Sequence, residues 1–199
     1  MEINNLLDEY FNNLYMDGLE YDKLIYMIAE SKENQKYIID YAKKMEDGEK
    51  RVQGIIGIMR ETYGLYSNEY KIDFSSLYNW VLRQMFHPNF YDYSFSSRFS
   101  SFLVLTSGNR LKVFKDIINR MDVKNPLNVQ IAICSTYGQN FFQYEEEGKQ
   151  FLSKVLQAIE ANTNNQQIIA DFNWFLKKVF LYPEYKKYKK IFIKYFKFE

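Results

Sequence analysis

The sequence predicts an all-α protein built from stacked antiparallel helix pairs. Along nearly the whole chain, apolar residues recur every three or four positions, which is the spacing of one face of an α-helix. Turn-forming residues interrupt this pattern at short intervals, and no two strand-like runs are joined by an Asn-Gly or Asp-Gly turn. A chain of 199 residues can bury about 70% of its unfolded surface as one unit. We therefore expect one all-helical domain over residues 1–199.

Within this domain we distinguish three sections. Residues 1–47 contain eleven acids and five lysines, a net charge of −6, and are expected to form acidic N-terminal helices. Central helix pairs are expected over residues 48–162. Residues 163–199 contain eight lysines and three acids, a net charge of +5, and are expected to form a basic helix pair. Such an asymmetry between the two ends of a chain can steer a charged partner.

From residue 48 onward the interruptions group the predicted helices in four pairs. The pairs are 49–66 with 73–86, 93–107 with 110–121, 126–138 with 146–161, and 166–180 with 184–197. Each pair takes about 35–40 residues, which is the unit length of helical-hairpin repeats. In this spacing, over about three quarters of its length, the chain resembles HEAT-like helical-repeat proteins, although no repeated motif accompanies the period. The resemblance implies a right-handed α-solenoid of about 9–11 helices, and a compact helical bundle is the alternative.

Apolar stripes along the sequence predict the individual helices. In chain order the clearest stripes are Val52, Ile55, Ile56, Met59 and Tyr63; Phe74, Leu77, Tyr78, Val81 and Met85; Phe95, Phe99, Phe102 and Leu103; Leu111, Phe114, Ile117, Ile118 and Met121; Phe151, Leu152, Val155, Leu156 and Ile159; and Ile168, Ile169, Phe172, Phe175, Leu176 and Val179. The stretch 126–138 alternates in a way that could mimic a strand. Asn125 as cap, Pro126 in the first turn and Gly138 beyond the end favour a helix there instead.

Two glycines near the start of the second section predict a close helix contact. Gly54 and Gly57 have the spacing of the GXXG loop of KH domains, but that loop needs strands around it and the neighbours here are helical. We therefore expect these glycines to let another helix approach. Glu145–Glu147, by contrast, lie where acids stabilise a helix N-terminus.

The residues that most often carry chemistry give no catalytic pattern. The only histidine, His87, precedes Pro88 and is expected to lie at a helix C-terminus, where its charge complements the helix dipole. The only cysteine, Cys134, lies in an apolar run and is expected to be a small, inert core residue. One Cys and one His cannot supply a structural zinc site, which usually takes four such ligands. We expect no metal, no cofactor and no enzyme activity.

The charged ends supply two candidate partner-binding patches. The acidic patch comprises Asp8, Glu9, Tyr10, Asp17, Glu20 and Asp22. Tyrosines beside acids suit recognition of a basic protein, because tyrosine gives contact area at low entropic cost while the acids orient the partner. The basic patch comprises Lys186, Lys187, Lys190, Lys194 and Lys197, which share one side of the predicted last helix. Tyr185, Tyr188, Ile191, Phe192, Tyr195 and Phe196 share the other side. For both patches the alternative is a solvated helix face, in the second case that of a terminal capping helix.

From these observations we predict a non-catalytic module that binds another protein. Bacterial immunity or antitoxin-like inhibitors, which cover the active cleft of a toxin or enzyme, are small helical proteins of this kind. One alternative is binding of a nucleic-acid backbone by the lysine-rich C-terminal helix, as in the HEAT-like DNA-alkylation repair enzymes that the chain resembles at fold level. Twenty lysines against six arginines weigh against sequence-specific recognition of bases. A further alternative is an enzyme whose site is scattered over several helices.

The sequence also bears on the compartment. The stretch "MEINNLLDEYFNN" carries acids and amides where a signal peptide would need a positive end and an apolar run. The longest unbroken run of aliphatic or aromatic residues, Phe102–Leu105, is far shorter than the ~20 residues that span a bilayer. We therefore expect a soluble cytoplasmic protein without a membrane span.

Overall fold

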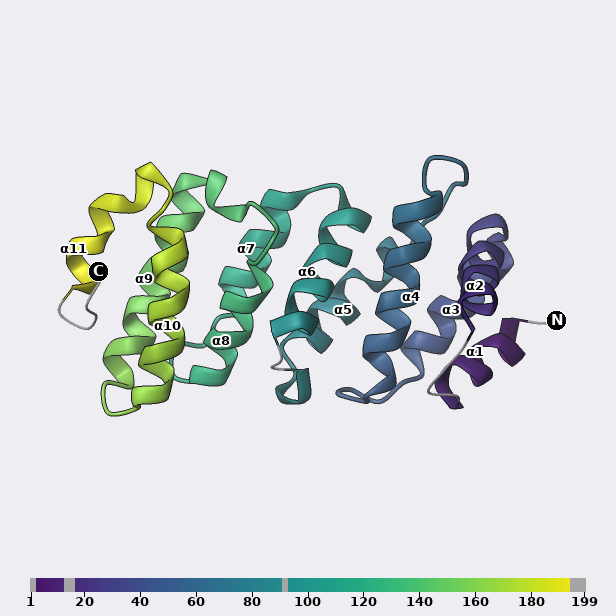
Figure 1. The fold of residues 1–199 in the computed structure, drawn as a ribbon, viewed down its shortest axis with the longest axis horizontal. Coiled ribbons are helices and arrows are strands. Elements are labelled where there is room, and N and C mark those ends of the chain that lie inside the picture. The colour runs from purple at the N-terminus through teal and green to yellow at the C-terminus, as the bar shows by residue number, and fades with distance from the viewer. Residues whose placement is uncertain (1–2, 13–16, 91–92, 194–199) are drawn as a thin grey trace. The chain divides into compact units, whose positions relative to one another are not determined.

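The computed structural model describes residues 3–12, 17–90 and 93–193 (Figure 1). Over these residues the chain forms eleven α-helices, four short 3₁₀ helices and no strand, which confirms the predicted all-α fold. The chain divides into two compact units. Unit 1 comprises Met1–Phe90 with Arg98–Asn109, and unit 2 comprises Tyr91–Ser97 with Arg110–Glu199. The single domain, and the choice between a right-handed solenoid and a compact bundle, stay predictions.

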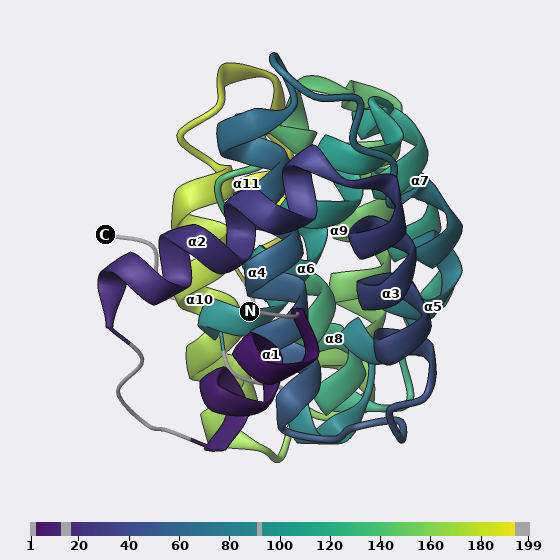
Figure 2. The same ribbon diagram turned by 90° about the vertical axis from the view of Figure 1, so that its right-hand side faces the viewer.

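The first half of the chain supplies these elements: α1 (Ile3–Asn12), α2 (Gly18–Glu30), α3 (Lys32–Lys43), α4 (Arg51–Tyr66), η1 (Ser75–Leu77), α5 (Tyr78–Met85), η2 (Pro88–Phe90) and α6 (Tyr93–Ser107). In unit 1, α2 packs on α1, α3 and α4, and Figure 2 shows α2 lying across α4 with α3 beside it. Leu24, Ile25 and Ile28 of α2 are fully buried in this contact, as the periodic apolar spacing requires.

A buried amide fixes one chain reversal of unit 1. Gln35 on α3 is 5% exposed, and its Nε2 donates to the carbonyl oxygens of Ala29 at 3.1 Å and Lys71 at 3.4 Å. Its Oε1 accepts a hydrogen bond from the backbone nitrogen of Asp73 at 3.3 Å. The loop after α4 is therefore tied to α3 by one side chain, and no polar group of that amide is left unsatisfied.

The predicted close approach of a helix to the glycine pair is confirmed at one position only. A Cβ atom at Gly54 would lie 2.9 Å from Cε1 of Phe11 and 3.0 Å from Cε1 of Tyr10, so α1 packs where Gly54 has no side chain. At Gly57 a Cβ atom would meet no described atom within 4 Å, so the expectation is wrong there.

The second half of the chain supplies α7 (Arg110–Arg120), α8 (Pro126–Ser135), η3 (Phe141–Gln143), α9 (Glu145–Ala161), α10 (Gln166–Val179), η4 (Pro183–Tyr188) and α11 (Lys189–Phe192). In unit 2, α9 contacts α7, α8, α10 and η3. Phenylalanines fill the centre: the ring of Phe114 stacks on that of Phe141 at 4.9 Å, and Phe142 meets Phe151 edge-on at 5.7 Å.

Helix termini in unit 2 follow the predicted signals. The side chain of Asn125 accepts from the backbone nitrogen of Asn128, Pro126 stands at the first helical position, and Gly138 adopts a φ of +73° beyond the end of α8. Glu145, Glu146 and Glu147 form the first turn of α9. A contact that sequence patterns do not reveal joins α9 to α7. The Nζ of Lys154 donates to the carbonyl oxygens of Ile118 at 2.7 Å and Met121 at 3.1 Å, which satisfies acceptors at the end of α7.

The predicted helix over 184–197 is wrong in its first part. The chain forms the 3₁₀ helix η4 and then α11, which has only four residues. In a 3₁₀ helix residues three apart eclipse one another, and this places the rings of Tyr182, Tyr185 and Tyr188 in a row with 6.4 Å between neighbours. Ile191, expected on the apolar side, is 46% exposed, and Tyr195 and Phe196 lie outside the described residues.

Candidate partner-binding site

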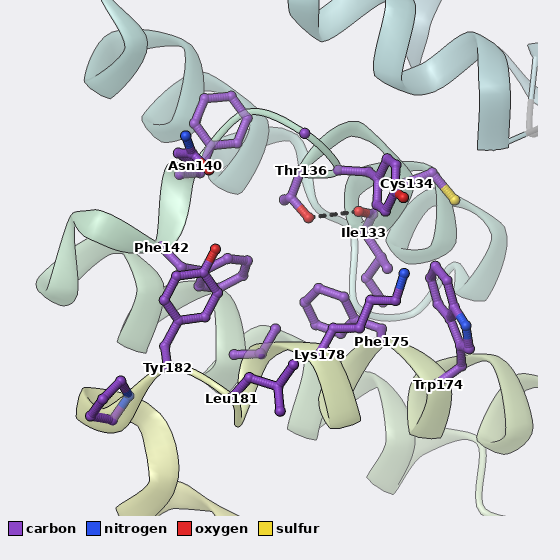
Figure 3. Close-up of a pocket in the computed structure, with 15 residues that line it drawn as sticks. Ile133, Cys134, Thr136, Asn140, Phe142, Trp174, Phe175, Lys178, Leu181 and Tyr182 are labelled. Atoms are coloured by element: carbon purple, nitrogen blue, oxygen red, sulfur yellow. Dashed lines mark hydrogen bonds between the residues drawn. The ribbon is translucent and has the colours of Figure 1, made fainter.

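A hollow of about 450 Å³ opens on unit 2 between the α8–η3 segment and the α10–η4 segment, which face each other across it (Figure 3). We call it the aromatic groove. Its lining residues are Ile133, Cys134, Thr136, Tyr137, Gly138, Asn140, Phe141, Phe142, Trp174, Phe175, Lys178, Val179, Leu181, Tyr182 and Pro183. Its volume falls within the range of about 300–1,000 Å³ that is usual for ligand pockets.

The groove has a buried floor and an exposed apolar rim. Phe141, Phe142, Phe175 and Val179 of the floor are each at most 6% exposed. On the rim, Leu181 is 76% exposed, Tyr137 59%, Trp174 46% and Tyr182 39%. Four large apolar side chains around one hollow form a contiguous apolar surface, which marks an interaction site more often than scattered exposed residues do.

The chain reversal after α8 produces this arrangement. The hydroxyl of Thr136 donates to the carbonyl oxygen of Ile133 at 2.7 Å, which satisfies an acceptor at the end of α8. Gly138 and Asn140 then adopt left-handed backbone conformations, with φ of +73° and +53°. Tyr137 is thereby left on the surface, while Phe141 is fully buried in the core. Asn140 is one of the few residue types other than glycine that tolerate this conformation.

One charged side chain, Lys178, lines the groove. Its Nζ lies 4.1 Å from the centre of the Trp174 ring and 4.8 Å from that of Tyr137, so the ammonium group is held by two ring faces. Figure 3 shows the lysine stem running from α10 toward the indole. Among the described side chains, no carboxylate lies within ion-pair distance of Lys178, and no aspartate or glutamate lines the groove.

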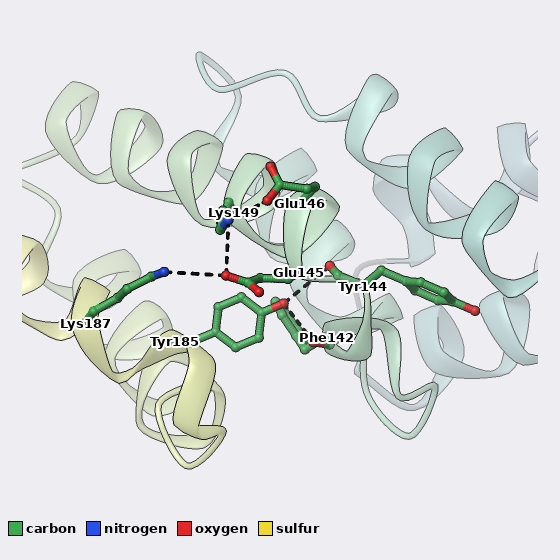
Figure 4. A network of polar contacts seen from close by, with 7 residues as sticks. All are labelled: Phe142, Tyr144, Glu145, Glu146, Lys149, Tyr185 and Lys187. Atoms are coloured by element: carbon green, nitrogen blue, oxygen red, sulfur yellow. Dashed lines mark hydrogen bonds and ion pairs between the residues drawn. The ribbon is translucent and has the colours of Figure 1, made fainter.

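Tyr185 anchors η4 to the segment that leads from η3 into α9 (Figure 4). It is fully buried, and its hydroxyl donates to the carbonyl oxygen of Phe142 at 2.7 Å. The carbonyl oxygen of Tyr144 is a second, more distant acceptor at 3.4 Å. Burial raises the pKa of Tyr185, so the phenol remains a hydrogen-bond donor. A Cβ atom at Gly148 would lie 2.1 Å from the Tyr185 hydroxyl, so only glycine fits at that position of α9.

An ion-pair network beside Tyr185 involves part of the predicted basic patch. The carboxylate of Glu145 lies 3.1 Å from Nζ of Lys149 and 3.5 Å from Nζ of Lys187. The hydrogen bond from Lys149 lowers the pKa of Glu145, with a smaller effect from Lys187. The predicted patch is therefore divided: Lys186 and Lys190 are exposed, Lys187 pairs with Glu145, and Lys194 and Lys197 lie outside the described residues.

The predicted acidic patch is distributed over α1 and α2 in unit 1. Asp8, Asp17 and Asp22 are exposed, and Glu9, Tyr10 and Glu20 are half-buried. Two of the six have structural roles. Asp17 caps α2 by accepting from the backbone nitrogen of Leu19 at 3.3 Å, and the ring of Tyr10 packs on those of Phe11 and Tyr21 at 5.0 and 5.7 Å. Partner binding by the other four acids stays a prediction.

His87 belongs to the turn after α5. Its backbone nitrogen donates to the carbonyl oxygen of Gln84 at 2.9 Å, and its Nδ1 accepts from the backbone nitrogen of Asn89 at 3.3 Å. The imidazole covers Gly48, where a Cβ atom would lie 2.1 Å from Cε1 of His87. Gly48 has a φ of +79°, so both its backbone and the space around it favour glycine. Cys134 is buried in unit 2, as expected of a core residue.

Sequence reasoning missed the aromatic groove. A partial signal exists, because Trp174 and Lys178 have the i, i+4 spacing that places two side chains together on a helix. Tyr137 joins them only through the turn at Gly138 and Asn140, and its sequence position does not reveal this. Across the described segments, no three His, Cys, Asp or Glu side chains gather in a way that could hold a metal ion. Within those same ranges, no helix has the length and apolar character needed to span a bilayer.

No protein-family model, curated protein sequence or solved structure matches the chain.

Proposed function

We propose that this chain is a non-catalytic protein-binding module whose contact surface centres on the aromatic groove of unit 2. The observation that carries the proposal is the ring of exposed Leu181, Tyr137, Trp174 and Tyr182 around a buried phenylalanine floor. Tryptophan and tyrosine are the residues most enriched among those that dominate binding energy at protein interfaces.

The energetics favour a partner that covers the rim. Removing apolar surface from water is worth roughly 25 cal/mol per Å², and fully burying one large apolar side chain about 1.5–3 kcal/mol. Leu181 at 76% exposure and Tyr137 at 59% have most of that gain still available. A protein segment can contact both the hollow and these outer side chains.

An inhibitor of the immunity or antitoxin kind remains the specific role within this proposal. Such a protein needs only a surface complementary to its target and no reacting groups of its own. The pairing of Lys187 with Glu145 reduces the free positive charge of η4, which weighs against the alternative of nucleic-acid backbone binding.

The test is selection of a random twelve-residue peptide library against the purified full chain. Clones that also bind the Trp174→Ala/Leu181→Ser variant are discarded. We expect clones that bind the wild type and lose at least tenfold in affinity for this variant, because the variant truncates two of the four exposed rim side chains. Leu19→Ser is the matched control, since Leu19 in unit 1 is 78% exposed against 76% for Leu181. The proposal fails if no clone distinguishes the wild type from the groove variant while binding the Leu19→Ser protein normally.

A further inference from the structure

The aromatic groove contains one unbalanced charge. Lys178 is its only Lys, Arg, Asp or Glu, and the lining residues all belong to the described part of the chain. The other polar groups of the lining are hydroxyl, amide and thiol side chains. A ligand that fills the groove therefore meets an apolar surface with a single positive group.

The position of the ammonium group suits recognition of an anion. The faces of Trp174 and Tyr137 attract the cation through their quadrupoles and hold it at the rim, but neutral rings cannot compensate its charge. An ammonium group has three donors, and no described acceptor receives a hydrogen bond from Lys178. A partner that covered the rim without an acceptor would desolvate this charge at a cost.

A partner carboxylate removes that cost. We propose that the aromatic groove binds a segment of a partner protein in which one large apolar side chain lies within a helical turn of an Asp or Glu carboxylate. The apolar side chain occupies the hollow against Phe142 and Phe175, and the carboxylate pairs with Lys178. This inference rests on the proposed function and specifies the chemistry of the partner.

The exposed rim favours a protein segment over a small acid. Leu181 and Tyr137 stand at the outer edge of the groove with most of their surface in water. A segment of several residues can cover these side chains while it places both the anchor and the carboxylate. A small aromatic or aliphatic acid that fills the hollow leaves the outer side chains exposed.

The test is a double-mutant cycle with the groove-specific peptides selected above. Each peptide is titrated against the full chain by isothermal calorimetry, first as selected and then with its Asp or Glu changed to Asn or Gln. The protein is used as wild type, as Lys178→Met, which keeps the aliphatic stem, and as Lys177→Met. Lys177 is the matched control, because it is exposed on the same helix and does not line the groove.

We expect the acid-to-amide change to weaken binding about tenfold to the wild type and to the Lys177→Met protein, and less than twofold to the Lys178→Met protein. The inference is overturned if groove-specific peptides lack an acid near their apolar anchor, or if the two lysine variants weaken binding equally. In either case the proposed function still stands, because the peptides depend on the rim. If no groove-specific peptide is obtained, the proposed function fails and the inference with it.

Discussion

In unit 1 two chain reversals are held by buried amide side chains, whereas in unit 2 the reversal after α8 is held by aromatic rings. Gln35 and Gln84 bond to the loops around Asp73 and Gly48. The reversal after α8 is instead fixed by Phe141, stacked on Phe114, and by Phe142 between α9 and η4. The hydrogen bonds of a side-chain amide are directional, and they use up polar groups inside the unit. The burial of apolar rings is driven by a non-directional effect, and here it leaves part of the apolar surface exposed at a rim.

Aromatic rings at or near the surface therefore differ in role between the two units. Tyr26, Tyr66 and Tyr70 of unit 1 meet one another edge to face at 5.8–6.3 Å, and the hydroxyl groups of Tyr26 and Tyr70 are hydrogen-bonded at 3.2 Å. These rings cover each other. In unit 2, the rim rings surround a hollow. The comparison teaches that an exposed ring indicates a binding site only where its neighbours leave a space to fill.

The largest expected effect comes from disturbing the aromatic fit of unit 2. We expect Gly148→Ala to lower the free energy of unfolding by about 3 kcal/mol, because the new methyl group overlaps the buried Tyr185 ring. Gly64→Ala in unit 1 is the control: no described atom lies within 4 Å of its Cβ position, so we expect stabilisation by about 0.5–1 kcal/mol from helix propensity. Urea unfolding followed by tryptophan fluorescence measures both, because each unit contains one of the two tryptophans of the chain.

A second outcome sharpens this result. In the Gly148→Ala background, Tyr185→Phe removes the closest clashing atom, so the two changes together are expected to cost less than the sum of the single changes. Strict additivity would contradict the clash as the cause.

The corresponding change in unit 1 removes its buried amide. We expect Gln35→Leu to lower the free energy of unfolding by about 2 kcal/mol, because the carbonyl of Ala29 and the backbone nitrogen of Asp73 lose their partner. Gln150→Leu, an exposed position on α9, is expected to change stability by less than about 0.5 kcal/mol. Urea unfolding monitored by tryptophan fluorescence makes the comparison, and equal effects of the two variants would show that the hydrogen bonds of Gln35 do not hold the loop.

The smallest expected effect is a pH dependence in unit 1. The hydrogen bond from Arg83 lowers the pKa of Asp47 below its reference value of 3.8, and a bond from Gln84 adds to this. A lowered folded-state pKa contributes stability above about pH 4 that is lost as the pH falls through the folded-state value. Because both partners are largely exposed, we expect Asp47→Asn to cost no more than about 0.5 kcal/mol at pH 7.

The midpoint of urea unfolding at pH 7 and below pH 3 tests the sign. We expect the difference between wild type and Asp47→Asn to shrink at the lower pH, because the Asp47 carboxylate is progressively protonated as the pH falls through its folded-state pKa. Asp22→Asn is the control, because Asp22 is exposed and forms no ion pair with a described residue. A difference that grows toward low pH would contradict this account.

Much of the secondary structure could be predicted from sequence, and the candidate site could not. The Asn125–Pro126 start of α8 and the acidic first turn of α9 are local signals, readable from neighbouring residues. The 3₁₀ form of η4 was missed because it depends on Tyr185, which is buried and whose hydroxyl donates a hydrogen bond to Phe142. These two residues are 43 positions apart in the chain. The aromatic groove joins Tyr137 with Trp174 across a comparable separation in the chain, which spacing rules within one helix cannot reach.

The sequence by itself determined that this protein is helical, where most of its helices begin and end, and that its charges differ between its ends. These properties depend on residues within a few turns of one another, because hydrophobic periodicity and capping act over short distances along the chain. Only the tertiary structure decided which aromatic rings are buried and which are left around a hollow. That outcome depends on how side chains from distant helices fill a shared space. The spacing of apolar residues along one helix does not determine this packing.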